Sequence, residues 1–370
     1  MTTAEELFSG KLVLAPMTKG SNVPFRRLCR ELGADVTVGE MAIAKKIVQR
    51  RRGELALLRV HPEDRPFGAQ LADRNPETLA KAAAAAEERG ADFVDLNCGC
   101  PIDHFTRKGL GAKLLSRPNR IGVLIAAMKA AVSIPVTVKI RLGWDERKIN
   151  YLDVARIAED AGAAAIAMHG RTREQRYSRA ADWEEIARLK EAVSVPVIGN
   201  GDLLTHWEFH DRWERSGADA LMTARGALVK PWIFQEVKER RTIHKTAAER
   251  LDLCRRYVAL AREHFGDDEH GRTRILDFLV WHLGFFCRYR HLPEEVYEAP
   301  EFAHPLLQTR HDTTATGEGL EALMQRTDRA AHEHLARIAL GELDEDAPAP
   351  PAPEDEGRGG DDAVLETSNG

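Results

Sequence analysis

The sequence has no long apolar run and no regular framework of cysteines. No stretch approaches the about 18 consecutive apolar residues that a membrane helix needs, so we predict no transmembrane segment. The first residues, MTTAEELFSGKL, carry acids where a signal peptide has bases, and no apolar core follows them, which argues against secretion. Five cysteines, an odd number without framework spacing, argue against a disulfide scaffold and favour a reducing, cytoplasmic setting.

A strong charge excess is also lacking once the C-terminal segment is set apart. The net charge is −5, but residues 341–370 contain ten acids and one base, a net of −9. The other 340 residues carry 52 bases against 48 acids, a net of +4. This mildly basic body permits an RNA partner without requiring one. Because residues 346–370 are rich in Pro, Gly and acids, we predict a disordered acidic tail there.

Short apolar runs alternate with amphipathic stretches over the first two thirds of the chain. The eight runs lie at 12–17, 36–41, 65–71, 92–99, 136–141, 165–170, 197–202 and 220–226. Several of the intervening stretches end in a glycine, the residue expected where a helix stops (Gly33, Gly90, Gly162 and Gly217). Eight βα units in about 220 residues predict an α/β fold, the (β/α)8 TIM barrel. The alternative, a doubly wound open sheet, would more often carry a G-x-G-x-x-G turn after its first strand.

The strand pattern stops after residue 241. The stretches 247–266, 273–290 and 318–343 have helical periodicity. We therefore predict a barrel domain over 1–241, a small all-α domain over 242–345 and the tail over 346–370.

Polar residues close most of the predicted strands, at the end where such a barrel has its active site. They are Gln70, Asn97, Lys139, Arg141, His169, Asn200, Asp202 and Arg225. Lys139 and Arg141 share strand parity, so both face one side, and burying two cations calls for an anionic ligand. The segments 199–202 and 224–226 offer small residues and backbone N–H groups where barrels bind phosphate. The pattern alone fits a phosphorylated planar cofactor or a phosphorylated sugar substrate equally well.

Cys100 is the candidate proton donor. It stands in a Gly-Cys-Pro turn after the fourth run, and a thiol with an ordinary pKa of about 8.5 is mostly protonated at neutral pH. Cys98, two residues earlier, is expected to pack within the strand. A zinc site of Cys98, Cys100 and His104 would lack a fourth nearby ligand, so we predict no metal.

The loop after the sixth strand is rich in arginine. His169 ends that strand, and Arg171, Arg173, Arg176, Tyr177 and Arg179 follow it. The arginines form either a solvated surface or a contact with a phosphate backbone, on which Tyr177 would stack against a base. The fourth loop adds His104, Arg107 and Lys108 to the same rim.

Taken together, these motifs resemble the tRNA-dihydrouridine synthases, flavoenzymes with an FMN-bearing barrel and a helical C-terminal tRNA-binding domain. The likeness covers about residues 11–290 and rests on LAPM, GAQL, LNCGCPID, VKIRLGW, HGRTREQRYSRAADW, GNGD and ARGALVKPWIF. LNCGCPID and ARGALVKPWIF most resemble the subgroup that modifies position 47 of eukaryotic tRNA, here without that subgroup's N-terminal zinc-finger extension.

The resemblance implies roles for single residues. It implies flavin contacts from Pro16, Met17, Thr18, Gln70, Asn97, Lys139 and His169, and a phosphate cradle of Asn200, Gly201, Asp202, Ala224, Arg225 and Gly226. Candidate substrate contacts are Asn97, Arg141, Arg171, Arg173, Arg176 and Tyr177. Cys100 matches the catalytic cysteine. The helical domain would supply tRNA affinity through bases that include Arg255, Arg256, Arg272, Arg274, Arg288 and Arg290.

The implied reaction is reduction of the uridine C5–C6 double bond. Reduced FMN would give hydride to C6, Cys100 would give a proton to C5, and NADPH would reduce the flavin again. The uracil must leave its stack to reach the flavin. The expected partners are tRNA and NADPH, with no membrane and no obligate protein partner.

Two alternatives stay open. A small-molecule FMN oxidoreductase of the dihydroorotate dehydrogenase type would not need the arginine-rich sixth loop or the helical domain. A non-catalytic tRNA-binding protein would not need Cys100, Lys139 and the phosphate cradle.

Overall fold

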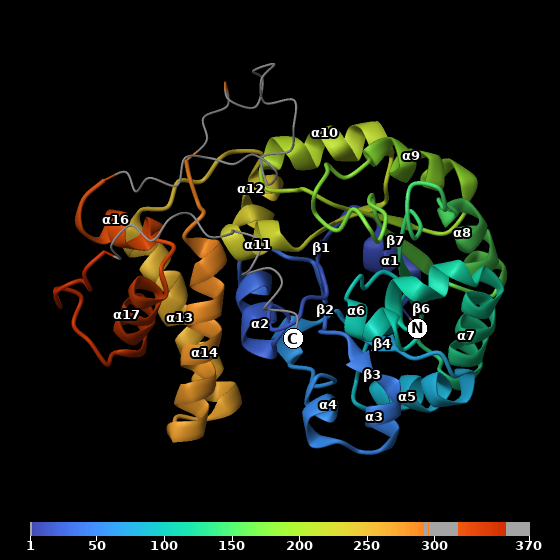
Figure 1. Ribbon diagram of the computed structural model, residues 1–370, viewed down its shortest axis with the longest axis horizontal. Coiled ribbons are helices and arrows are strands. Elements are labelled where there is room, and N and C mark those ends of the chain that lie inside the picture. Colours follow the sequence, from blue (N-terminus) through green and yellow to red (C-terminus); the bar gives the residue numbers. More distant parts are fainter. Residues whose placement is uncertain (1, 292–294, 296–316, 353–370) are drawn as a thin grey trace.

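The structure is a computed structural model that describes residues 2–291, 295 and 317–352. A parallel sheet closes into a barrel, and a group of C-terminal helices packs against one side of it (Figure 1). The strands are β1 Lys11–Leu14, β2 Val36–Val38, β3 Ala42–Ile43, β4 Phe67–Ala72, β5 Phe93–Asn97, β6 Val136–Arg141, β7 Ala165–His169, β8 Val197–Asn200 and β9 Ala220–Thr223. Each of the eight predicted runs overlaps a strand, so the TIM-barrel prediction is confirmed.

The sheet order is β2-β1-β9-β8-β7-β6-β5-β4-β3, and a pairing of β2 with β4 closes the barrel. All pairings between these strands are parallel. The two-residue strand β3, which the sequence pattern did not predict, extends the edge of β4 beyond this closure.

Helices surround the barrel, on its outside and at its ends. They are α1 Ala4–Phe8, α2 Val23–Glu31, α3 Ala44–Val48, α4 Arg52–Ala56, α5 Pro76–Glu88, α6 Asp103–Thr106, α7 Pro118–Ala131, α8 Tyr151–Asp160, α9 Trp183–Ala192, α10 His206–Ser216, α11 Arg225–Val229 and α12 Ile233–Glu239. Two 3-10 helices, η1 Pro62–Asp64 and η2 Gly111–Ser116, lie in the connections. The glycines predicted to stop helices have positive φ, 104° at Gly33, 89° at Gly90, 95° at Gly162 and 61° at Gly217.

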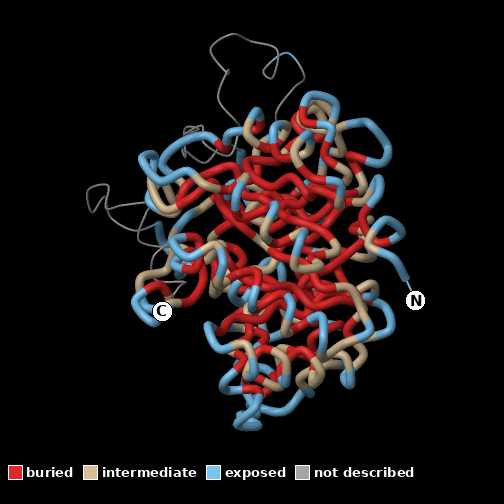
Figure 2. The backbone as a smooth tube through the Cα atoms, turned by 90° about the vertical axis from the view of Figure 1, so that its right-hand side faces the viewer, coloured by how far each residue is buried: buried red, intermediate tan, exposed pale blue. Residues whose placement is uncertain are grey.

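Strand parity separates two cores. Residues facing the barrel interior form one cluster (Val13, Val36, Phe93, Ala165, Ala167, Ile198 and Ala220 among them). The alternate residues pack outward against the helices. Helix α1 closes the N-terminal end of the barrel, where Phe8 meets Phe93 edge to face at 5.3 Å between ring centroids. The strands are therefore buried on both faces, and the exposed residues lie in loops and on helix surfaces (Figure 2).

The C-terminal helices are α13 Ala247–Phe265, α14 Glu269–Phe286, α16 Gly319–Gln325 and α17 Arg329–Leu340. The stretch 318–343 thus forms two helices, because Asp328 caps the start of α17 by accepting a hydrogen bond from the N–H of Ala331. Phe25 of α2 contacts Phe278 and His282 of α14, so one apolar core runs from barrel to helices. The boundary at 241 stays a prediction.

Part of the predicted tail is held by the helical domain. Arg326 donates hydrogen bonds to the carbonyls of Pro350 (2.6 Å) and Pro351 (2.8 Å). The start of the segment predicted to be disordered therefore has a defined place, and residues 353–370 lie outside the described residues. Among the described residues, no helix is long and apolar enough to span a membrane.

Candidate active site at the C-terminal mouth of the barrel

Polar side chains fill the barrel interior from the middle of β5 and β6 to the C-terminal ends of the strands, and we call them the polar layer. Its members are Gln70 on β4, Asp95 and Asn97 on β5, Thr137, Lys139 and Arg141 on β6, His169 on β7 and Asn200 on β8. Each has the strand parity of the interior apolar cluster below it. The structure therefore brings together the residues that the sequence predicts at these strand ends.

Three amide and carboxyl groups of this layer form a chain of hydrogen bonds. The Nδ2 of Asn97 donates to Oε1 of Gln70 at 2.7 Å, and the Nε2 of Gln70 donates to Oδ2 of Asp95 at 2.8 Å. The hydroxyl of Thr137 donates to the other carboxyl oxygen of Asp95 at 2.6 Å. Burial raises the pKa of Asp95. Asp95 was missed in the sequence, although its parity with Asn97 in DFVDLN indicated an interior position.

Lys139 stands at the centre of the mouth. Its Nζ donates to Oδ1 of Asn200 at 2.8 Å, and the Nδ2 of Asn200 donates to the carbonyl of Met222 at 2.7 Å. Burial, with the repulsion of Arg141, lowers the pKa of Lys139 to about 7. Lys139 is therefore close to half-charged at neutral pH and would gain charge beside an anion.

Asp202 is the buried anion that holds two arginines. It follows β8 with φ 51°, and its carboxylate accepts from Arg171, from Nη2 of Arg225 at 3.0 Å and from the N–H of Ala181 at 2.8 Å. The side chains of both Arg171 and Asp202 are completely buried. A substrate contact needs an exposed side chain. The side chain of Arg171 has no exposed atom with which to contact an RNA backbone.

His169 is held as a neutral imidazole. Burial, followed by the charges of Arg141 and Arg171, lowers its pKa well below the usual value. The Nη1 of Arg171 lies 2.9 Å from Nε2 of His169. Since arginine can only donate, Nε2 accepts and the ring proton belongs on Nδ1.

Cys100 sits in a turn that Asn97 and Arg141 fix. The Oδ1 of Asn97 accepts from the N–H of Cys100 at 2.9 Å, and Nε of Arg141 donates to the carbonyl of Gly99 at 2.9 Å. Burial raises the pKa of the Cys100 thiol, so the group is protonated at neutral pH. Arg141, buried itself, has a pKa lowered to about 10, first by burial, and remains charged.

Cys98 faces the other way. It is completely buried and belongs to the cluster between the sheet and the outer helices, with Val94 and Leu96 of the same strand. Its packing position is as predicted. Among the described residues, no group of three or more His, Cys, Asp or Glu side chains is arranged to hold a metal ion.

The arginine-rich loop folds over the connection that follows β5. Arg173 pairs with Asp103 and lies 4.7 Å from the ring centroid of Trp144. The Nη2 of Arg176 lies 3.4 Å from the same carboxylate, and its side chain is 42% exposed. The guanidinium of Arg225 lies 4.3 Å from the ring centroid of Tyr177. Of the three loop arginines predicted to contact substrate, Arg176 is thus the most exposed, and the more exposed Arg179 pairs with Glu146.

The two predicted phosphate segments are in contact. A Cβ on Gly226 would lie 1.9 Å from the carbonyl oxygen of Leu203, and the hydroxyl of Thr223 donates to that same oxygen at 3.0 Å. Gly201 has φ 138°. Ala224 precedes α11, whose first N–H groups have no partner within the helix. Glycine is therefore required at position 226, where the chain packs against the residue that follows 200–202.

The donor set fits a phosphate-bearing cofactor. Four cations, Lys139, Arg141, Arg171 and Arg225, each lower the pKa of His169 by their charge. Asp202 pairs with two of them, which leaves Lys139 and Arg141 without a carboxylate partner among the described residues. A bound anion would relieve this repulsion.

The residues after the first strand lie near the surface. Pro16 and Met17 are half-buried and Thr18 is exposed. The hydroxyl of Ser21 accepts a hydrogen bond from the N–H of Met17 at 2.8 Å.

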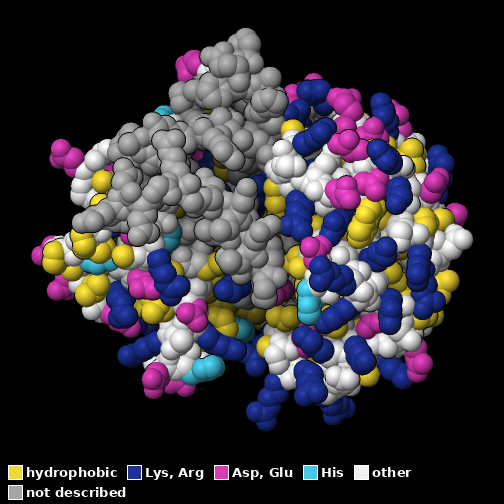
Figure 3. Space-filling view, in the orientation of Figure 1, with side chains coloured by type: hydrophobic (Ala, Val, Ile, Leu, Met, Phe, Trp, Pro, Cys, Tyr) yellow, Lys and Arg dark blue, Asp and Glu magenta, His cyan; other side chains and the backbone are white. Residues whose placement is uncertain are grey.

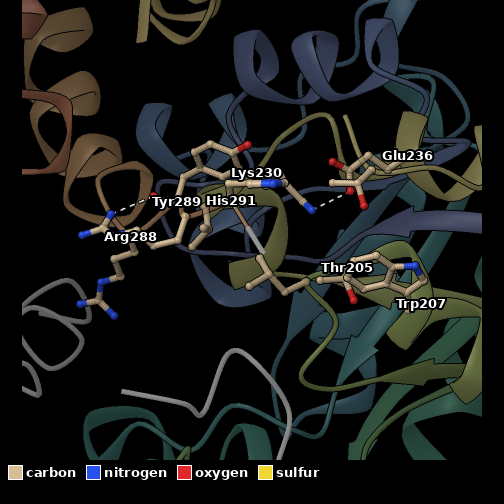
Figure 4. Close-up of a pocket in the computed structure, with 11 residues that line it drawn as sticks. Thr205, Trp207, Lys230, Glu236, Arg288, Tyr289 and His291 are labelled. Carbon is tan, nitrogen blue, oxygen red and sulfur yellow. Dashed lines mark hydrogen bonds and ion pairs between the residues drawn. The ribbon is translucent and has the colours of Figure 1, made fainter. Parts of the chain in front are cut away.

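A small cavity lies where the barrel meets the helical domain (Figure 4). Its volume is about 20 Å³, and Lys230 and Glu236 form an ion pair of 2.6 Å in its wall. This volume accommodates about one water molecule, so the cavity is too small for a nucleotide or a cofactor.

The arginines expected to bind tRNA on the helical domain are partly neutralised. Arg255 pairs with Asp252 and Glu345, Arg256 with Glu31, and Arg272 with Asp267. Arg274 and Arg288 lie over phenylalanine rings. The tRNA affinity of this domain stays a prediction.

Comparisons with known proteins match most of the chain to one family. The family model for dihydrouridine synthase (Dus) matches residues 13–288. The chain is 40% identical over 304 residues to a Xenopus tropicalis protein named tRNA-dihydrouridine(47) synthase, NAD(P)(+), -like, covering 80% of this chain and 47% of the relative. It is 41% identical over 317 residues to tRNA-dihydrouridine(47) synthase, NAD(P)(+), of Coprinopsis cinerea, covering 80% and 47%. The chain spans about half the length of the curated relatives it matches.

A solved complex of 2-naphthoyl-CoA reductase aligns with a TM-score of 0.50 at 11% identity, covering 62% of this chain and 50% of that one. At this identity the likeness concerns the fold alone.

Proposed function

The chain belongs to the dihydrouridine synthase family, and from that premise we propose that it reduces the C5–C6 double bond of uridine in tRNA, with FMN as cofactor and NADPH as reductant. The relatives' names carry position 47, which is therefore the position to test first. One observation carries the proposal. The single side chain of Asn97 bonds Gln70 of the polar layer and the backbone of Cys100, so it joins the cofactor side of the mouth to the proton donor.

The residues of the mouth would hold the cofactor by its anionic and polar groups. Arg225, Asn200, Gly201, Ala224 and Gly226 would receive the phosphate, with Asp202 fixing Arg225. Lys139, Gln70 and the Nδ1–H of His169 would face the ring and ribityl chain, and Pro16, Met17 and Thr18 would line the first strand. When bound, the reduced flavin supplies a hydride for C6, which no side chain can supply.

Cys100 would give its thiol proton to C5 of the uracil. The proton leaves the sulfur as the C5–H bond forms, and the resulting thiolate is stabilised by Arg141 and by the backbone N–H of Ile102. Uridine gains two electrons and two hydrogens, NADPH supplies the electrons through the cofactor, and solvent restores the thiol. The raised pKa of Cys100 suits a donor that must stay protonated until the base arrives.

The rim would receive the RNA strand. Arg176 and Tyr177 would meet the nucleotides beside the flipped uridine, with Arg173 and Arg141 behind them. We assign Arg171 to positioning, because its buried pair with Asp202 fixes the loop that carries the other residues.

Mapping of dihydrouridine in cellular tRNA tests the proposal. A strain that lacks the gene should lose dihydrouridine at one tRNA position, and the wild-type gene should restore it whereas Cys100→Ala should not. An unchanged dihydrouridine map in the deletion strain would exclude this function.

A further inference from the structure

A basic hollow of about 570 Å³ lies beside the mouth of the barrel. It is lined by Arg74, Asn75, Thr106, Arg107, Gly109, Lys113, Leu114, Arg117 and Arg120. These residues come from the loop after β4, from α6 and η2 after β5, and from the first turn of α7. Because all three segments follow strands at their C-terminal ends, the hollow opens on the same face of the barrel as the candidate active site.

The five cations of the hollow lack local counterions. Among the described residues, none of Arg74, Arg107, Lys113, Arg117 and Arg120 forms an ion pair. The adjacent carboxylates are engaged elsewhere. Asp73 accepts backbone N–H groups of Lys45, Arg74 and Asn75, and Asp103 pairs with the arginine-rich loop. The helical domain differs, since there several arginines are matched by acids.

The hollow has a fixed framework. The guanidinium of Arg120 donates twice to the carbonyl of Arg74, at 3.1 Å from Nε and 2.7 Å from Nη2, and so ties the β4 loop to α7. The ammonium of Lys113 lies 4.8 Å from the ring centroid of Trp144. Gly109 has φ 80°, and a Cβ there would lie 3.3 Å from Cδ of Arg74. These contacts leave Arg107 and Arg117 as exposed cations at the edge of a preformed site.

The same segment that carries Lys113 also closes on the proton donor. The N–H of Ala112 donates to the carbonyl of Cys100 at 3.0 Å. A Cβ on Gly111 would lie 2.7 Å from that carbonyl oxygen, so the backbone of η2 lies directly against the Cys100 turn. An anion in the hollow would therefore lie against η2, the same short helix that contacts the backbone of Cys100.

The basic surface continues from the hollow toward α3 and α4. Lys45, Lys46, Arg50, Arg51 and Arg52 are exposed there, and the bond from the N–H of Lys45 to Asp73 joins this segment to the loop of Arg74. Figure 3 shows Lys and Arg side chains gathered over the lower part of the barrel, where Figure 1 places α3 to α7. This arrangement forms a track of positive charge that leads to the mouth.

We propose that the hollow binds a backbone phosphate of the RNA strand close to the nucleotide that enters the mouth. Phosphate oxygens match guanidinium donors in geometry and charge, and five unpaired cations around one hollow supply the attraction. Phosphate contacts give affinity and register without reading sequence. The proposal rests on the proposed function, because it takes tRNA as the substrate.

Binding of an unmodified tRNA transcript to the flavin-loaded protein, titrated at several salt concentrations, tests the hollow. The test variant is Arg107→Gln with Arg117→Gln. The matched control is Arg89→Gln with Arg156→Gln, which removes two exposed arginines from α5's far end and from α8. A third variant, Arg107→Lys with Arg117→Lys, keeps the charge.

We expect the Gln pair to weaken tRNA binding by about tenfold and to reduce the steepness of the plot of log affinity against log salt by about 1. The Lys pair should keep most of the affinity, and the control should match the wild type. Equal affinity and salt dependence for the Gln pair and the control would overturn the proposal.

Two further outcomes separate the possible errors. If the Gln pair raises the KM for NADPH but not for NADH, and tRNA affinity is unchanged, the hollow holds a dinucleotide phosphate and the RNA assignment is wrong. If the wild type modifies no tRNA, the proposed function fails, whereas an active wild type with unaffected variants rejects the hollow alone.

Discussion

The two cysteines of LNCGCPID lie two residues apart, and replacing each with alanine should affect a different property of the protein. Cys100 is partly exposed over the mouth and its thiol is protonated, whereas Cys98 is buried on the outer face of β5. Cys100→Ala removes the proposed acid, and a positioned acid contributes about 10²- to 10⁴-fold to a rate. We therefore expect uridine reduction to slow by about 10²- to 10⁴-fold in this variant, with the flavin still bound.

Cys98→Ala removes one buried sulfur and leaves a small cavity between the sheet and the helices. A loss of this size costs about 1–2 kcal/mol of stability, and it should leave the reduction rate within about twofold of the wild type. The two variants thus separate chemistry from packing, because one loses rate without stability and the other loses stability without rate.

The assay is single-turnover oxidation of the prereduced flavin by tRNA, followed by its absorbance, beside urea unfolding of each protein. Reduction of the flavin by NADPH serves as an internal control, since hydride delivery to the cofactor does not use the thiol. A normal rate in Cys100→Ala with a slow rate in Cys98→Ala would reverse the assignment. Normal rates in both would remove cysteine from the mechanism.

Three further predictions concern the polar groups of the mouth. Asp202→Asn should destabilise the flavin-free protein by about 3–5 kcal/mol in urea unfolding, because Arg171 is left buried without its partner; a change of less than about 1 kcal/mol would contradict the buried pair. FMN affinity should fall by up to about tenfold per pH unit between pH 7 and 9, since the Lys139 pKa of about 7 means that binding of the anion takes up a proton there. Lys139→Arg stays charged and should flatten this profile, and an equally steep profile in that variant would exclude Lys139 as the cause. Asp95→Asn should lower flavin content in the purified protein, because Gln70 and Thr137 donate to different carboxylate oxygens and the amide NH2 that replaces one of them cannot accept. Full occupancy would show that the hydrogen-bond chain does not order the mouth.

The barrel was predictable from the sequence because its physical signal is local. The strands are short and rich in apolar residues, amphipathic helices follow them, and several of these helices end in a glycine. These features can be recognised without knowledge of tertiary contacts. The two-residue strand β3 carries too little pattern to be recognised, and it forms because its neighbours place it beside β4. The sequence pattern predicts one helical stretch over 318–343, because the break before α17 depends on a single capping residue, Asp328.

The polar layer was predictable in part. Their position at the ends of apolar runs predicted Gln70, Asn97 and Lys139 at the mouth, and the structure has them there. Spacing along a loop does not tell which arginine turns inward, so Arg171 was expected at the surface but pairs with Asp202 inside. The basic hollow was beyond prediction, because its cations come from three segments that meet only when the β4 and β5 loops pack together.

The most direct test uses the purified protein, FMN, NADPH and an unmodified tRNA transcript. After incubation, mass spectrometry of the digested tRNA should detect one uridine that has gained two hydrogens, and we expect it at position 47, the position in the relatives' names. The product should disappear when Cys100→Ala replaces the wild type. Oxidation of NADPH by the flavin-loaded protein without any dihydrouridine in the tRNA would contradict the assignment of tRNA uridine as the substrate.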